Sequence, residues 1–133
     1  MKKEKSCGAV VFNDKNEVLL ITHNDGHICF PKGHVELNET EVETAKREVL
    51  EETGILIQID NSKRVVITYN PKVDVVKDVV FFRAKAIGGT ISPQIEEVKE
   101  VRWVSIDEAF LLITYDDSKE VLSKMIGSDG SEN

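Results

Sequence analysis

Residues 33–55 read GHVELNETEVETAKREVLEETGI. Seven of these 23 residues are Glu, against Lys46 and Arg47, which gives the stretch a net charge of −5. The whole chain of 133 residues has a net charge of −7, so the other 110 residues carry only −2. One short segment therefore holds most of the acidic excess, and its function has to explain that excess.

The stretch carries the capping signals of a helix between two loops. Asn38 is a residue type that caps helices, and Glu41 stands three residues later, as a capping-box partner does. Gly54 suits the left-handed position that ends a helix. We therefore expect a helix over residues 39–53.

Three glutamates of this helix, Glu48, Glu51 and Glu52, are spaced i, i+3 and i+4, so they project within an arc of about 100°. Carboxylates placed so closely repel one another. We expect Arg47 to project beside Glu51 rather than among all three, which leaves that repulsion in place. A solvated acidic face is the ordinary alternative. However, convergent carboxylate oxygens are the ligands that Mg²⁺ prefers, together with water and substrate phosphates.

The flanking sequence predicts an α/β fold with a mixed sheet covered by helices. Ser105 with Glu108 forms a second capping pattern, which predicts a short helix as far as Leu112, and a last helix is expected over residues 118–126. Runs rich in Val, Ile and Phe between turn residues predict strands over residues 7–12, 18–21, 55–59, 64–69, 73–86 and 101–104.

Length and composition exclude several classes of protein. Hydrophobic residues make up 41% and charged residues 31%, which fits one soluble domain, residues 1–127, with a flexible tail at residues 128–133. The acidic balance opposes non-specific binding to nucleic acid and to anionic membranes. No apolar run approaches the ~20 residues of a membrane span, and no signal-peptide pattern is present. We expect a cytoplasmic protein, either a monomer or a homodimer.

The two cysteines and two of the histidines do not indicate a further functional site. Cys7 and Cys29 are not spaced as a Cys-x-x-Cys pair and lie in apolar stretches, so we expect buried free thiols rather than zinc ligands or a disulfide. His23 and His27 flank a predicted turn, where we expect them to be exposed to solvent.

At this point the stretch resembles the signature of a known family, the Nudix box of the Nudix hydrolases. Its pattern fixes seven residues and two aliphatic positions at set spacings. A chance match is therefore on the order of one in 10⁸ per start position. The resemblance implies an α/β/α sandwich around a mixed sheet. It also implies a hydrolase that uses water to attack a phosphorus of a nucleoside diphosphate linked to another group. The matching residues are Gly33, Glu39, Arg47, Glu48, Glu51, Glu52 and Gly54, with Val49 and Ile55 in the aliphatic positions.

The resemblance implies a metal site on the expected helix. Glu48, Glu51 and Glu52 would bind Mg²⁺, for which Mn²⁺ is a possible substitute, and the carbonyl of Gly33 often joins them.

The resemblance also implies structural roles around this site. Glu39 and Arg47 would form an ion pair that holds the loop on the helix, and Gly54 would end the helix. The alternative for Arg47 is a surface pair with Glu43 or Glu51, worth only ~0.3–0.5 kcal/mol.

The general base that takes a proton from the attacking water is left open. Within the box, Glu52 or Glu48 could take it. Many relatives instead use a Glu in a loop before a strand that carries Trp, and Glu97, six residues before Trp103, fits that spacing best. Glu97 would then also lie at the metal.

The flanks of the box resemble the branch of the family that hydrolyses diadenosine tetraphosphate. By this resemblance the partner is a small nucleotide polyphosphate, with Tyr69 and Tyr115 stacked on adenine and Lys32, His34 and Lys77 near phosphates. A flat aromatic face and cationic donors suit those roles. Pyrophosphohydrolases of nucleoside triphosphates, ADP-ribose or RNA 5′ ends remain open, as does a non-catalytic nucleotide-binding module.

Overall fold

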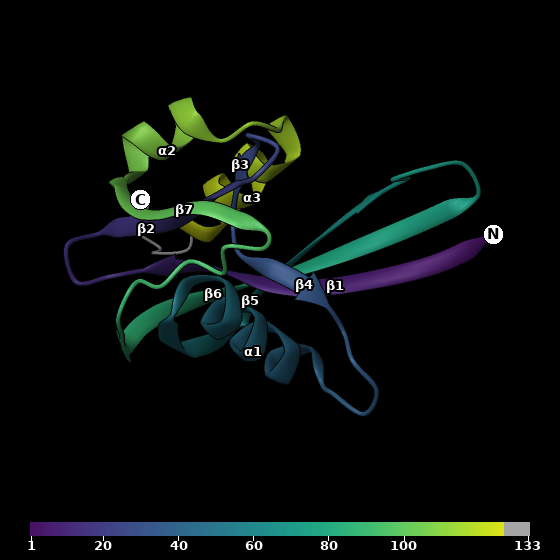
Figure 1. Ribbon diagram of the computed structural model, residues 1–133, viewed down its shortest axis with the longest axis horizontal. Coiled ribbons are helices and arrows are strands. Elements are labelled where there is room, and N and C mark those ends of the chain that lie inside the picture. The colour runs from purple at the N-terminus through teal and green to yellow at the C-terminus, as the bar shows by residue number, and fades with distance from the viewer. Residues whose placement is uncertain (127–133) are drawn as a thin grey trace.

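A mixed β-sheet between helices forms the protein (Figure 1), in a computed structural model that describes residues 1–126. The predicted tail at residues 128–133 lies outside the described residues. The elements are β1 (Lys2–Phe12), β2 (Glu17–His23), β3 (Ile28–Cys29), β4 (Lys32–His34), α1 (Glu41–Thr53), β5 (Ile55–Tyr69), β6 (Val75–Gly89), β7 (Val98–Ser105), α2 (Ile106–Leu112) and α3 (Asp116–Ile126).

Strand β1 is the centre of this sheet. It runs parallel to β6 along its whole length, and β6 in turn pairs with β5 in antiparallel fashion. Its other edge pairs with β4 over Ser6–Gly8 and meets β2 at Phe12. β2 is itself flanked by β3 and β7. The centre of the sheet therefore holds β4, which begins the acidic stretch, next to α1.

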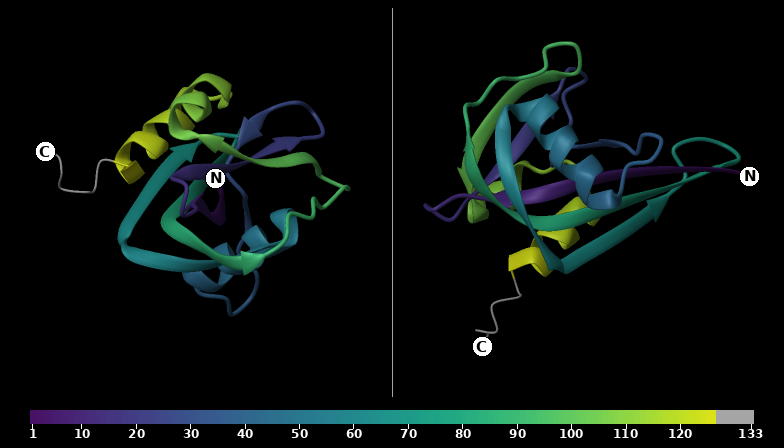
Figure 2. Two further views of the ribbon diagram at one scale, coloured as in Figure 1. Left: turned by 90° about the vertical axis from the view of Figure 1, so that its left-hand side faces the viewer. Right: turned by 90° about the horizontal axis from the view of Figure 1, so that it is seen from below.

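The helices lie on opposite faces of the sheet, with α1 on one face and α2 and α3 on the other (Figure 2). Successive residues of β1 point to opposite faces. Ala9 belongs to the core that includes Val49 of α1, whereas Val10 belongs to the core that includes Leu122 of α3. Burial on both faces explains why the second half of β1, residues 7–12, is continuously apolar. The predicted α/β/α sandwich with a mixed sheet is confirmed.

The prediction that Asn38 caps the long helix is wrong, because Thr40 is the N-cap of α1. The Thr40 hydroxyl accepts a hydrogen bond from the backbone N of Glu43, and the Glu43 carboxylate accepts one from the backbone N of Thr40. Asn38 has a φ of 69°, whereas an N-cap residue takes an extended conformation. The helix ends as predicted, at left-handed Gly54 with a φ of 82°.

The prediction of two separate strands interrupted at residues 60–63 is also wrong, because β5 runs continuously through these residues. The register shifts between Asp60 and Arg64, and an Asp60 side-chain oxygen accepts a hydrogen bond from the backbone N of Ser62. The polar residues thus form a bulge within one strand rather than a turn between two. The short strands β3 and β4 were not predicted, and the other differences lie at element ends: β1 starts at Lys2, β6 covers Val75–Gly89, β7 starts at Val98 and α3 starts at Asp116.

Two further expectations concern burial and membranes. Cys7 and Cys29 are buried free thiols, as predicted. Within residues 1–126, no helix is both long enough and apolar enough to cross a membrane.

Candidate active site

The three glutamates of α1 differ in their surroundings. Glu52 is only 3% exposed, and its Oε1 accepts a hydrogen bond from the backbone N of Lys32 at 3.0 Å. Glu48 is partly buried, while the side chain of Glu51 is 47% exposed. The helix therefore presents one buried, one half-buried and one exposed carboxylate next to β4.

Two glycines allow β4 to lie against these carboxylates. A Cβ added at Gly33 would stand 2.0 Å from Cδ of Glu48. A Cβ added at Gly8 of β1 would stand 2.2 Å from the carbonyl oxygen of Pro31, just before β4. Both distances are far below van der Waals contact, so a side chain at Gly8 would push the start of β4 away, and one at Gly33 would displace either Glu48 or β4. The sequence needs glycine here for close approach rather than for a turn.

Arg47 lies between two of the glutamates, which corrects the expectation that it leaves their repulsion in place. Its Nη1 donates to Oε2 of Glu48 at 2.9 Å and to Oε1 of Glu51 at 3.1 Å. The long side chain carries the guanidinium from its own position on the helix to the space between these two neighbours. Arg47 therefore neutralises part of the acidic cluster.

The same guanidinium ties the loop before α1 to the helix. Arg47 donates to both carboxylate oxygens of Glu39, from Nε at 2.6 Å and from Nη2 at 3.0 Å, and Nη2 also donates to the carbonyl of His34 at 2.9 Å. The hydroxyl of Thr44 donates to Glu39 as well. Hydrogen bonds from Arg47 lower the pKa of Glu39 to about 2, so Glu39 is ionised at neutral pH. The pair implied by the family resemblance is present in this geometry, whereas Glu43 caps the helix.

Burial makes the charge of Glu52 unfavourable. Desolvation raises its pKa to about 8, the negative charges of Glu48 and Glu97 act in the same direction, and the Lys32 N–H opposes them. Burial also raises the pKa of Glu48. Among the described residues no cationic side chain forms an ion pair with Glu52. A hard divalent cation would supply the missing positive charge, and carboxylate oxygens are the donors it prefers, so this site fits Mg²⁺.

Glu97 reaches the same region from the loop before β7. The backbone N of Asn24 donates to the carbonyl of Glu97 at 3.0 Å, and the backbone N of Gln94 donates to the carbonyl of Glu52 at 3.4 Å. These bonds attach the loop to the β2–β3 turn and to the last turn of α1. The structure thus brings Glu97 near Glu48 and Glu52, close enough for its charge to raise their pKa values.

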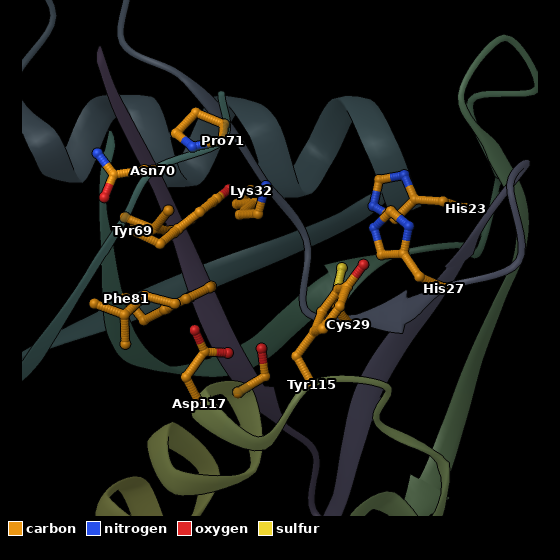
Figure 3. A pocket seen from close by; sticks show the side chains of 13 residues that line it. His23, His27, Cys29, Lys32, Tyr69, Asn70, Pro71, Phe81, Tyr115 and Asp117 are labelled. Atoms are coloured by element: carbon orange, nitrogen blue, oxygen red, sulfur yellow. The ribbon is translucent and has the colours of Figure 1, made fainter. Parts of the chain in front are cut away.

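A cavity of about 460 Å³ lies beside β4 (Figure 3). Three of the predicted substrate residues, Lys32, Tyr69 and Tyr115, line it. The other two do not: His34 is exposed, and Lys77 is buried in β6, where burial and the nearby charge of Lys32 lower its pKa. The remaining lining residues are His23, His27, Cys29, Ile67, Asn70, Pro71, Val79, Phe81, Asp117 and Ser118.

The prediction that His23 and His27 are exposed is wrong, since both are half-buried in the wall of this cavity. Their rings stack with centroids 4.0 Å apart, and the His27 ring lies 5.8 Å from the Tyr115 ring. Their spacing across a short turn could have predicted this pairing, because it places both side chains on one face of a hairpin. Asn70 and Asp117 gave no such signal, since their segments meet only in the folded chain.

Comparison with known proteins extends the similarity to nearly the whole chain. Residues 2–125 match the family model described as NUDIX domain. The rat bis(5′-nucleosyl)-tetraphosphatase [asymmetrical] is 31% identical over 136 residues, which cover 90% of this chain and 91% of the rat protein. The putative mutator protein MutT4 of Mycobacterium tuberculosis is 38% identical over 75% of this chain and 44% of its own length. A crystal structure of an Ap4A hydrolase binary complex from C. elegans superposes with a TM-score of 0.81 at 25% identity, covering 93% of this chain and 96% of that one.

Proposed function

Because this chain belongs to the NUDIX domain family and is a hydrolase of phosphoric anhydride bonds, we propose that it hydrolyses diadenosine tetraphosphate asymmetrically, to AMP and ATP, with Mg²⁺. The observation that carries this proposal is the cavity in which Tyr69 and Tyr115 lie with Lys32, whose backbone N donates to the Glu52 carboxylate. The likeness to asymmetrical tetraphosphatases, along almost the full length of both proteins, supports the same substrate.

The cavity suits a nucleotide with several phosphates. Tyr69 at the end of β5 and Tyr115 just before α3 offer aromatic faces on its wall for an adenine ring (Figure 3). Lys32 offers an ammonium group to phosphate oxygens, and buried Lys77 adds positive charge near it. Since the backbone N of Lys32 also binds Glu52, phosphates held by Lys32 lie next to the carboxylates.

The carboxylates have two tasks in this proposal. Glu48, Glu51 and Glu52, with Glu97, would hold the divalent cation, and Arg47 would give up its contacts to Glu48 and Glu51 as the cation enters. When bound, the cation polarises the P–O bond and acidifies a water molecule. A carboxylate then accepts the proton of the attacking water, and Glu52, Glu48 and Glu97 are the candidates.

A substrate panel tests this function. The purified protein is incubated with Mg²⁺ and diadenosine tetraphosphate, ADP-ribose, a nucleoside triphosphate or triphosphorylated RNA, and the products are separated by chromatography. We expect AMP and ATP from the first compound, with kcat/KM about tenfold or more above the others, and no hydrolysis after chelation by EDTA. EDTA saturated beforehand with Mg²⁺ is the control. Two molecules of ADP, or a preference for another compound, would reject this substrate.

Tyr115 tests the adenine contact. We expect Tyr115→Ala to raise KM for diadenosine tetraphosphate about tenfold or more, because base stacking on an aromatic side chain contributes ~1–3 kcal/mol. Tyr115→Phe keeps the ring and is expected to keep KM close to the wild-type value. Steady-state kinetics measure both, and an equal KM in the two variants would remove Tyr115 from the substrate contact.

A further inference from the structure

The hairpin of β2 and β3 gathers three metal-ligating side chains on one face. Ile21 pairs with Cys29 across the hairpin, and the backbone N of His23 donates to the carbonyl of His27 at 2.8 Å. Side chains two residues apart on a strand share a face, so His23 and His27 lie on the face of Cys29. The turn closes through Gly26, whose φ of 99° suits glycine.

The ligand atoms of this cluster are close together. One ring nitrogen of each histidine, His23 and His27, and the sulfur of Cys29 lie within 4.8 Å of one another. Among residues 1–126 this is the one group of three or more His, Cys, Asp or Glu residues that meets that limit. It does not include the carboxylates of α1, two of which are bridged by Arg47.

Each imidazole has one nitrogen left for a metal. Oδ1 of Asp25 lies 2.5 Å from Nδ1 of His27 and also accepts the backbone N–H of His27, so Nδ1 has a partner and Nε2 is the nitrogen left for a cation. Nε2 of His23 is buried and has no hydrogen-bond partner among the described residues. In metal sites, a histidine that binds the metal usually donates its other ring N–H to a carboxylate, which orients the ring. A buried nitrogen without a hydrogen-bond partner is satisfied when it binds a cation.

The cluster also has room for a fourth ligand. All three side chains line the 460 Å³ cavity, and Figure 3 shows the two rings and the sulfur on one wall of it, with Tyr115 next to them. A cation held there would keep one coordination position open to the cavity, for water or a bound anion.

We propose that His23, His27 and Cys29 form a second metal site, which takes Zn²⁺ or a cation of similar chemistry through both Nε2 atoms and the sulfur. Two imidazoles and a thiolate suit zinc, whereas Mg²⁺ prefers oxygen ligands. The Cys29 thiol releases its proton to solvent when the metal binds. The stacked rings turn about their χ2 bonds so that both lone pairs point at the cation.

Cobalt spectroscopy tests this site, since Co²⁺ occupies zinc sites and is coloured there. The full-length protein, in buffer containing Mg²⁺, is titrated with Co²⁺. We expect one equivalent to produce the visible bands of tetrahedral cobalt and a near-ultraviolet thiolate-to-cobalt band, and one equivalent of Zn²⁺ to remove both. A wild-type protein that shows no thiolate band with Co²⁺ overturns the proposal.

Matched variants identify the ligands. Cys29→Ser is expected to lose the thiolate band, whereas Cys7→Ser, which removes the other buried thiol, is expected to keep it. Glu52→Gln is expected to keep it as well, because the carboxylates of α1 belong to the other site. Asp25→Asn is expected to weaken Co²⁺ binding by about tenfold or more, as loss of a supporting carboxylate does.

Two results would contradict the assignment. One is a thiolate band that persists in Cys29→Ser or disappears in Cys7→Ser. The other is unchanged Co²⁺ affinity in His23→Ala, which removes a ligand without touching the sulfur and so covers the case in which Cys29→Ser does not fold. Neither result depends on which nucleotide the enzyme hydrolyses, so the site and the proposed substrate fail independently.

Discussion

Glu52→Gln is expected to lower kcat by about a thousandfold or more and, in the absence of divalent cations, to make the protein more stable. The loss of activity follows from the position of Glu52, a buried carboxylate next to the backbone of Lys32 and near Glu48 and Glu97. As a metal ligand or as the base, its charge is needed in the transition state, and such groups contribute 10²–10⁴-fold or more. Steady-state kinetics with saturating Mg²⁺ measure this effect.

The gain in stability follows from the raised pKa of Glu52. Burial raises it from 4.5 to about 8, so as the pH rises from about 4.5 to 8 the unfolded chain releases this proton before the folded protein does. The wild-type protein without metal therefore loses stability over that interval. Glutamine has no charge to desolvate and can still accept the N–H of Lys32. We expect a gain on the order of 2 kcal/mol at pH 7.5, or a melting temperature higher by ~5 °C or more, that vanishes near pH 4.5.

Glu51→Gln is the matched control for the stability measurement. It makes the same substitution one residue earlier, at a side chain that is 47% exposed and paired with Arg47. We expect no gain in melting temperature from it at either pH. Thermal unfolding by circular dichroism in EDTA compares the proteins. Wild-type turnover in Glu52→Gln would exclude this residue from the reaction. An unchanged melting temperature would show that burying its charge does not destabilise the folded protein.

Gly33→Ala is expected to lower kcat/KM by about a hundredfold while the fold persists. The new Cβ would stand 2.0 Å from Cδ of Glu48, so either Glu48 or β4 has to move. A displaced β4 also takes the backbone N of Lys32 away from Glu52. A shift of about 1 Å in a reacting group lowers a rate by ~10². Overpacking of this kind also destabilises by ~1–3 kcal/mol.

Gly88→Ala gives the control for Gly33→Ala. Gly88 lies in β6, and a Cβ there would have Leu56 as its nearest neighbour at 3.5 Å, an ordinary contact. We expect its kcat/KM to remain close to the wild-type value. The prediction for Gly33 fails if both variants keep full activity, since the carboxylate would then tolerate a side chain against it.

Local patterns predicted the parts of the fold that depend on neighbours in sequence. The helix over the acidic stretch, its end at Gly54 and the cap of α2 at Ser105 all follow from spacing within one or two turns. The start of α1 could not be predicted in this way, because Asn38 and Thr40 are both residue types that commonly cap helices. The bidentate pair of Glu39 with Arg47 holds the loop past Asn38, and the capping box of Thr40 with Glu43 then starts the helix.

The candidate site was predictable where one segment supplies it and unpredictable where several do. Residues 33–55 bring together Gly33, Glu48 and Glu52 by helical periodicity and one close approach. The cavity is different, because its walls come from β2, β3, β4, β5, β6 and the start of α3. Sequence spacing could not place His27 beside Tyr115, since that contact exists only after α3 has packed against the sheet.

Lys32 joins two otherwise independent parts of the protein, since its backbone binds Glu52 while its side chain lines the cavity. Glu48, Glu51 and Glu52 come from one continuous segment, whereas Glu97 and most of the cavity wall come from other segments. We therefore expect substitutions at Tyr69, Asn70 or Tyr115 to change which nucleotide is accepted while the geometry of these glutamates persists. For protein engineering, this makes the cavity wall the place to diversify and residues 32–54 the place to leave unchanged.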